Sequence, residues 1–111
     1  MKKLLILGGS GFIGSSIVNY GINKNLIINK INKIYILSRT AKISQNKKKH
    51  ISITYINKNM LNVSKLPQVD YIIYCLKNSN IKISNSYFNQ FLKILKNFKK
   101  KPKILFTSSG A

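Results

Sequence analysis

Short apolar runs recur along the chain and are separated by polar segments. Five of them cover residues 3–8, 34–38, 51–56, 70–76 and 104–107, and the fourth is rich in β-branched and aromatic residues. Short runs with this composition, bounded by glycine or polar residues, are typical of buried strands. The pattern therefore predicts five strands.

Helical spacing of apolar residues marks two of the segments between these strands. The first strand is followed by one such repeat, which consists of Phe12, Ile13, Ile17 and Tyr20. A second repeat predicts an amphipathic helix over residues 84–99 that Pro102 ends. Its apolar positions are Phe88, Phe91, Leu92 and Leu95.

Strands that alternate with helical segments are typical of βαβ units and a parallel sheet. Right-handed crossovers limit the topology, and the strand order 3-2-1-4-5 satisfies them. The 111 residues contain no internal repeat and no linker. We therefore expect a single α/β, Rossmann-like domain over residues 1–111.

A glycine-rich loop joins the first predicted strand to the helical segment after it. It contains Gly8-x-x-Gly11-x-x-Gly14, with Ser10 inside it as a hydroxyl donor. Gly8 permits a tight turn, Gly11 lets the backbone approach a pyrophosphate, and Gly14 lets the helix pack closely on the sheet. N–H groups at the start of the helix then face the phosphates. The loop predicts a dinucleotide site, and the alternative is a glycine-rich turn without a ligand.

The cofactor loop of the extended short-chain dehydrogenase/reductases resembles Leu7-Gly8-Gly9-Ser10-Gly11-Phe12-Ile13-Gly14. These enzymes are NAD(P)-dependent epimerases and dehydratases that act on nucleotide sugars. The resemblance extends along the chain, because residues 70–74 resemble the family's fourth strand and residues 106–111 the end of its fifth. It implies cofactor contacts from Gly8, Ser10, Gly11, Phe12, Ile13 and Gly14.

The end of the second strand indicates which cofactor is bound. In this fold an acid there holds the ribose diol and favours NAD. Here Ser38 stands at that place, and Arg39, the one arginine of the chain, follows it. A hydroxyl and a guanidinium can accept a 2′-phosphate, which an acid would repel. The pair predicts NADP(H), with NAD(H) as the alternative. The other interpretation of Arg39 is a surface cation.

The resemblance implies cofactor contacts after two further strands. After the third strand the family usually carries Gly-Asp beside the adenine, and this chain has Asn59 and Met60 there. After the fourth strand the family usually carries two small residues, and this chain has Leu76 and Lys77. By this correspondence Asn59, Met60 and Leu76 belong to the cofactor site.

The family's hydride transfer uses a serine together with a Tyr-x-x-x-Lys pair. The resemblance implies that Ser109 is the catalytic serine, with Ser108 as the near alternative, and the pair would follow beyond Ala111. We therefore expect a fold that is incomplete at its C-terminus. The chain would be the NAD(P)-binding portion of a sugar-nucleotide epimerase, dehydratase or reductase and inactive alone. The nucleotide-sugar substrate would bind the full-length enzyme.

The net charge suggests a different function. The chain has 20 Lys+Arg against 1 Asp+Glu, which gives +19 at pH 7. A small basic nucleic-acid-binding module is the alternative that follows from this charge. However, lysine, isoleucine and asparagine dominate together, as an A/T-rich coding sequence produces, and the runs 47–49 and 99–101 lack interleaved aromatic residues. We therefore favour coding bias over nucleic-acid binding.

Several further classes are excluded by length and composition. No apolar run approaches the ~20 residues of a membrane span. The four apolar residues from Leu4 to Leu7 are also too few for a signal peptide, whose apolar region has ~7–15 residues. We therefore expect a cytoplasmic protein without membrane contact. One cysteine, one histidine and one acidic residue are too few for a metal centre or an intrachain disulfide. The fifth strand would leave an uncovered apolar edge, which favours homo-oligomers or aggregation.

Overall fold

The structure is a computed structural model of the chain, and it describes residues 2–8, 31–38, 52–76 and 78–106. The strands in these ranges are β1 (Lys2–Leu7), β2 (Ile31–Leu37), β3 (Ser52–Ile56), β4 (Tyr71–Tyr74) and β5 (Lys103–Phe106). A short 3-10 helix, η1 (Met60–Asn62), follows β3. The α-helix α2 (Ile81–Leu95) connects β4 to β5.

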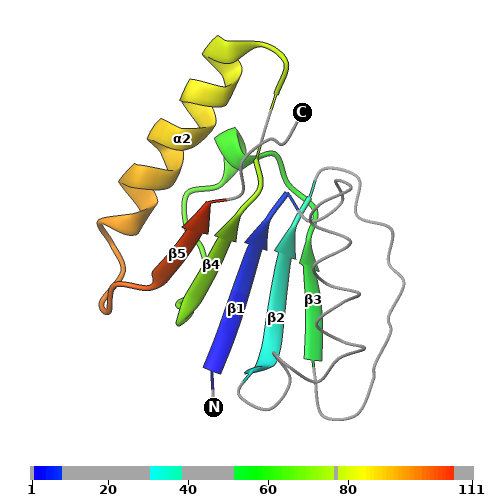
Figure 1. Cartoon of the computed structure of the whole chain (residues 1–111), viewed down its shortest axis with the longest axis vertical. Helices are drawn as coiled ribbons and strands as arrows, with labels where there is room; N and C mark the ends of the chain where they lie inside the picture. The colour runs from blue at the N-terminus through cyan, green and yellow to red at the C-terminus, as the bar shows by residue number, and fades with distance from the viewer. Residues whose placement is uncertain (1, 9–30, 39–51, 77, 107–111) are drawn as a thin grey trace.

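All the strand pairs are parallel, and the order across the sheet is β3-β2-β1-β4-β5 (Figure 1). The predicted α/β fold and the predicted strand order are therefore confirmed. Along the chain, β2 and then β3 lie on one side of β1, whereas β4 and then β5 lie on its other side. The carboxyl ends of β1 and β4 thus flank the point where the strand order reverses.

Alternate residues of the central strands bury two separate clusters on the two faces of the sheet. One face carries Leu5 and Leu7 of β1 together with Ile72 of β4. The opposite face carries Leu4 and Ile6 of β1 together with Ile34, Ile36 and Ile73. Because both sides of these strands are buried, their sequences are apolar almost without a break, as expected for parallel sheets.

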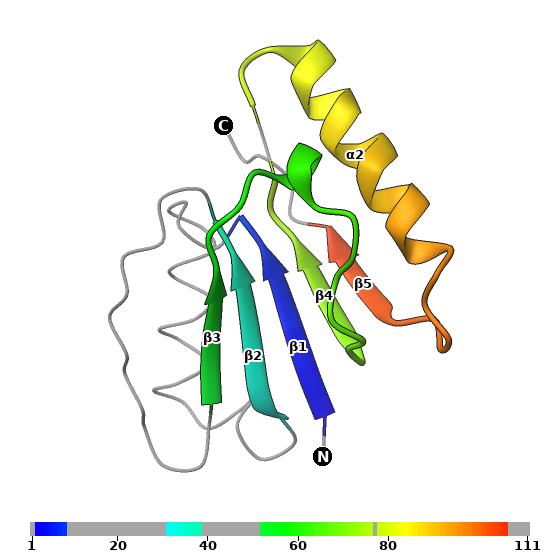
Figure 2. The ribbon, with the colours of Figure 1, turned by 180° about the vertical axis from the view of Figure 1, so that it is seen from behind.

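The connection between β3 and β4 contains η1 and an extended segment, in a part of the chain where the sequence predicts no helix. The segment crosses the face of the sheet on which α2 packs (Figure 2). Its side chains Val63, Leu66 and Val69 are buried there. Gln90 of α2 donates through Nε2 to the carbonyl oxygen of Val63 at 2.7 Å. These spaced apolar side chains thus cover the part of this face that lies beside α2.

Helix α2 begins and ends about one turn earlier than the predicted range of 84–99. Asn80 accepts a hydrogen bond from the N–H of Lys82 and caps the first turn. At the other end, Asn97 N–H and Phe98 N–H bond to carbonyls three residues back, which tightens the last turn. The buried side chain of Phe98 then enters the core. The helix therefore ends well before Pro102.

The buried face of α2 also differs from the predicted one. Its buried residues are Tyr87, Phe91 and Ile94. Phe88 and Leu92, expected in the core, are 38% and 41% exposed. Apolar residues cover more of this helix than the sheet can bury, so one flank stays in contact with solvent.

Among the residues that the structure describes, no helix is long and apolar enough to span a membrane.

Candidate functional site

The carboxyl ends of the first four strands form one continuous rim. Backbone hydrogen bonds extend the strand pairing beyond the strand ends: Gly8 N–H donates to Leu37 C=O at 2.8 Å, and Ser38 N–H donates to Ile56 C=O at 3.0 Å. On the other side of β1, Cys75 N–H donates to Leu7 C=O at 2.8 Å. These bonds place Gly8 between the ends of β2 and β4, at the reversal of the strand order.

Gly8 has a backbone that only glycine adopts without strain. Its φ is +89°, in the region that L side chains rarely enter. A Cβ atom at this position would lie 2.9 Å from the carbonyl oxygen of Cys75 and 3.3 Å from the amide nitrogen of Leu76. Both neighbours are backbone atoms and cannot rotate away. The tight turn predicted at Gly8 is therefore present.

Ser38 follows β2 directly and is 4% exposed. It adjoins Gly8 because the N–H of Gly8 bonds to Leu37, the residue before it. An acidic side chain at this buried position would carry a costly desolvated charge unless it were paired. A serine hydroxyl avoids that cost and can either donate or accept a hydrogen bond.

The structure gives Asn59 and Met60 roles in the packing of η1. The side-chain oxygen of Asn59 accepts a hydrogen bond from Leu61 N–H at 2.9 Å and caps the 3-10 helix. Met60 is almost fully buried, and its side chain belongs to the core cluster under α2. Their predicted contacts with a cofactor stay predictions.

Leu76 lies on the rim, since its amide nitrogen faces Gly8, and its half-buried side chain packs against the core cluster under α2. From the sequence, Cys75 was expected only to lie in an apolar strand. The structure brings the Cys75 carbonyl against Gly8, so its backbone forms one wall of the turn. Parallel pairing of β1 with β4 is the signal that could have indicated this.

The other predicted site residues lie outside the described residues. They are Ser10, Gly11, Phe12, Ile13, Gly14, Arg39 and Ser109. The described part of the site therefore consists of Gly8, Ser38 and the backbone of Cys75 and Leu76.

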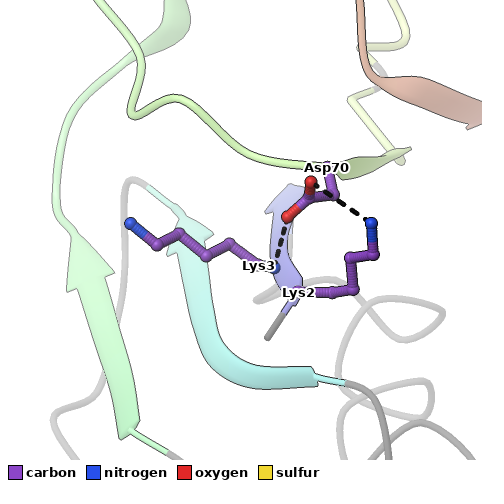
Figure 3. A network of polar contacts seen from close by, with 3 residues as sticks. All are labelled: Lys2, Lys3 and Asp70. Atoms are coloured by element: carbon purple, nitrogen blue, oxygen red, sulfur yellow. Dashed lines mark hydrogen bonds and ion pairs between the residues drawn. The ribbon is translucent and has the colours of Figure 1, made fainter. Parts of the chain in front are cut away.

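The rim has no acidic side chain. The one acidic residue of the sequence is Asp70, which precedes β4 and lies at the opposite, amino end of the sheet (Figure 3). A hydrogen bond from the backbone N–H of Lys3 lowers the pKa of Asp70. The carboxyl-end rim is thus free of side-chain negative charge, which suits an anionic ligand.

Tyr74 ends β4, and its ring packs 4.9 Å from that of Phe91, measured between centroids. Burial raises the pKa of the Tyr74 phenol to about 12, so the group is neutral at physiological pH.

Among the residues that the structure describes, no three His, Cys, Asp or Glu side chains gather as metal ligands would.

No family model matches this chain, and no curated protein matches it.

Proposed function

We propose that the chain is the dinucleotide-binding portion of an NAD(P)-dependent enzyme similar to the extended short-chain dehydrogenase/reductases, with NADP(H) as its cofactor. The observation that carries the proposal is Gly8, which turns with φ +89° at the carboxyl end of β1. Open α/β sheets bind ligands outside the carboxyl ends of their strands, where the strand order reverses. Gly8 lies at that point.

The described residues fit the pyrophosphate end of such a cofactor. Gly8 turns the chain at the rim, and the next residues, Gly9 to Gly14, supply further glycines and N–H donors in the sequence. The rim carries no side-chain negative charge to repel phosphates, because Asp70 lies at the other end of the sheet. When bound, the cofactor would supply the hydride chemistry.

The preference for NADP(H) is supported by the absence of a carboxylate. With one acidic residue in the sequence, no Asp or Glu can hold the ribose diol at the end of β2. Ser38 takes the position, and Arg39 follows it. A guanidinium can bind a 2′-phosphate through two hydrogen bonds.

The catalytic part of the proposal rests on the sequence. Ser109 would position the substrate oxygen, whereas the one Tyr-x-x-x-Lys spacing in the sequence, Tyr20 and Lys24, falls in the segment after the glycine loop and not after Ser109. The resemblance implies that the substrate of this reaction is a nucleotide sugar.

The test is a titration of the chain with NADPH and, separately, with NADH, followed by nicotinamide fluorescence. We expect saturable binding that is tighter for NADPH. Arg39→Gln should weaken NADPH binding about tenfold or more, because it removes a charge-assisted hydrogen bond, and should change NADH binding little. Lys65→Gln is the matched control, since it removes one positive charge at an exposed position between η1 and β4. Equal losses in both variants, or no saturable binding, would refute the proposal.

Nucleic-acid binding is the second candidate, and the net charge of +19 favours it. The described lysines Lys96, Lys99 and Lys101 are exposed at the end of α2 and in the loop before β5. Binding to a DNA duplex through such lysines would fall steeply as salt rises. If the chain binds duplex DNA at moderate salt while NADPH does not bind, this second function is the correct one.

A further inference from the structure

The connection from β4 to α2 leaves the sheet at the point where the strand order reverses. Its first residue, Cys75, donates its N–H to Leu7 C=O at 2.8 Å, which anchors it to β1. The connection then rises beyond the carboxyl ends of the strands before α2 begins (Figure 1). In an open α/β sheet, ligands bind in the crevice outside the strand ends at such a reversal. The segment after β4 is therefore one wall of this crevice.

A single side chain of α2 holds the other end of this segment. Asn78 N–H donates to Ser84 Oγ at 2.9 Å, and the Ser84 hydroxyl donates to Asn78 C=O at 2.8 Å. One hydroxyl thus binds both backbone groups of one residue, which uses its donor and one of its acceptor lone pairs. We call these two hydrogen bonds the Ser84 clamp.

The Ser84 clamp lies close to the rim. Asn78 is two residues after Leu76, so their Cα atoms are at most about 7.6 Å apart. The amide nitrogen of Leu76 in turn faces Gly8. The segment after β4 is therefore short and is held at both ends, by Leu7 of β1 and by Ser84 of α2.

The first turn of α2 has its own support, which is independent of Ser84. Asn80 accepts a hydrogen bond from Lys82 N–H through Oδ1 at 3.0 Å and caps the helix. Its backbone N–H donates to Asn78 Oδ1 at 2.8 Å. The hydroxyl of Ser84 is thus not needed to cap the helix, and both of its printed bonds go to the segment after β4.

We propose that Ser84 is a positioning residue for the cofactor, an inference that rests on the proposed function. It keeps the segment after β4 in place as a preformed wall of the crevice, so that cofactor binding does not have to order this segment. Without the hydroxyl, only a fraction of the molecules has the wall in place. The apparent Kd then rises by the inverse of that fraction.

The experiment is a titration of the chain with NADPH, followed by nicotinamide fluorescence at a temperature well below unfolding. Ser84→Ala removes both bonds of the clamp, and we expect it to raise the Kd about tenfold. Ser84→Thr keeps a hydroxyl that can donate and accept, so it should retain an affinity close to that of the wild type.

Two control variants separate positioning from stability. Ser86→Ala removes a hydroxyl of α2 that bonds only to Lys82 C=O in the same helix, and it should leave the Kd unchanged. Asn80→Ala removes the cap of α2 and leaves both bonds of the Ser84 clamp in place. It should lower the unfolding temperature while changing the Kd little.

Amide resonances follow the wall directly. We expect NADPH to shift the resonances of Leu76 and Asn78 in the wild type. Ser84→Ala should shift the same two resonances without any ligand, and those of Lys3 and Asp70, at the opposite end of the sheet, should stay where they are.

The outcomes distinguish this inference from the proposed function. If the wild type does not bind NADPH, the proposed function fails and this inference falls with it. If the wild type binds NADPH and Ser84→Ala binds it equally well, only this inference is overturned. Equal losses of affinity in Ser84→Ala and Asn80→Ala would also overturn it, because general loosening of α2 would then explain both.

Discussion

The carboxylate of Asp70 accepts a hydrogen bond of 2.9 Å from the backbone N–H of Lys3 (Figure 3). The backbone of Asp70 adds two more links, since its N–H donates to Lys3 C=O and its C=O accepts from Lys103 N–H, both at 3.0 Å. Asp70 thus connects β1 and β5 at the amino end of the sheet. The ion pair with Lys2, at 3.9 Å between partly exposed groups, contributes little beside these bonds.

This arrangement predicts an acid-dependent loss of stability from a single group. The N–H of Lys3 lowers the pKa of Asp70 in the folded chain below the ordinary 3.8. The stabilisation is therefore fully present above that value and is lost as the pH falls through the lower, folded pKa. We expect the free energy of unfolding, measured with denaturant, to decline across this acidic range.

Asp70→Asn is the variant that isolates the effect. It keeps a side-chain oxygen that can accept from Lys3 but cannot be charged, so its stability should be lower near neutral pH and nearly flat in acid. Asp70→Ala should lose more, because the N–H of Lys3 then has no side-chain acceptor. A wild-type acid profile that Asp70→Asn leaves unchanged would contradict the assignment.

Gly8→Ala should destabilise the fold and abolish cofactor binding. The φ of +89° alone costs a non-glycine residue about 1–3 kcal/mol. The new Cβ would also lie 2.9 Å from Cys75 C=O, which forces the ends of β1 and β4 apart. Thermal unfolding and NADPH titration of the same sample check both effects. Unchanged stability in this variant would mean that the turn has another conformation.

Two phenylalanines of α2 test which face of the helix is buried. Phe91 is fully buried, and Phe91→Ala should lower the free energy of unfolding by about 3–5 kcal/mol. Phe88 is partly exposed, so Phe88→Ala should cost only about 1 kcal/mol, chiefly its ring contacts with Tyr74 and Phe106. Urea unfolding of the pair measures the difference, and the reverse order would show that the helix packs by its other flank.

The strands and their order could be predicted because two strong physical rules act together. Apolar runs mark strands that are buried on both sides, and right-handed crossovers leave few orders for them. The strand ends were less certain. β2 begins at Ile31, three residues before the predicted start, because Asn32 and Lys33 interrupt the apolar run. Polar residues near the amino end of a strand still pair while their side chains reach solvent.

Helix α2 and the segment before β4 were harder to predict for different reasons. Residues 87, 88, 91, 92, 94, 95 and 98 are all apolar, so the sequence allows more than one buried stripe, and contact with the sheet selects one. The crossover after β3 has only the three-residue η1, which is too short for a periodic pattern. Asn59 and Met60 therefore resembled site residues, although one caps η1 and the other fills the core.

Of the candidate site, Gly8 was predictable because a tight turn between a strand and a glycine-rich loop has a definite backbone requirement. The buried state of Ser38 and the carbonyl of Cys75 against Gly8 depend on contacts between strands far apart in the sequence. No local pattern encodes such contacts. They follow once the order β2-β1-β4 is known.

Tyr74 predicts a second pH effect, at the alkaline end. Burial raises the pKa of its phenol from 10.0 to about 12, so the folded chain disfavours the ionised form. The contribution to stability is fully present below pH 10 and is lost as the pH rises toward 12, where the folded phenol ionises. Tyr74→Phe removes the ionisable group and keeps the ring. Above pH 10 the free energy of unfolding should therefore fall more steeply for the wild type than for Tyr74→Phe. Deprotonation of the lysines affects both proteins alike and leaves this difference unchanged. A gap that stays constant with pH would mean that the Tyr74 hydroxyl is hydrated in the folded chain.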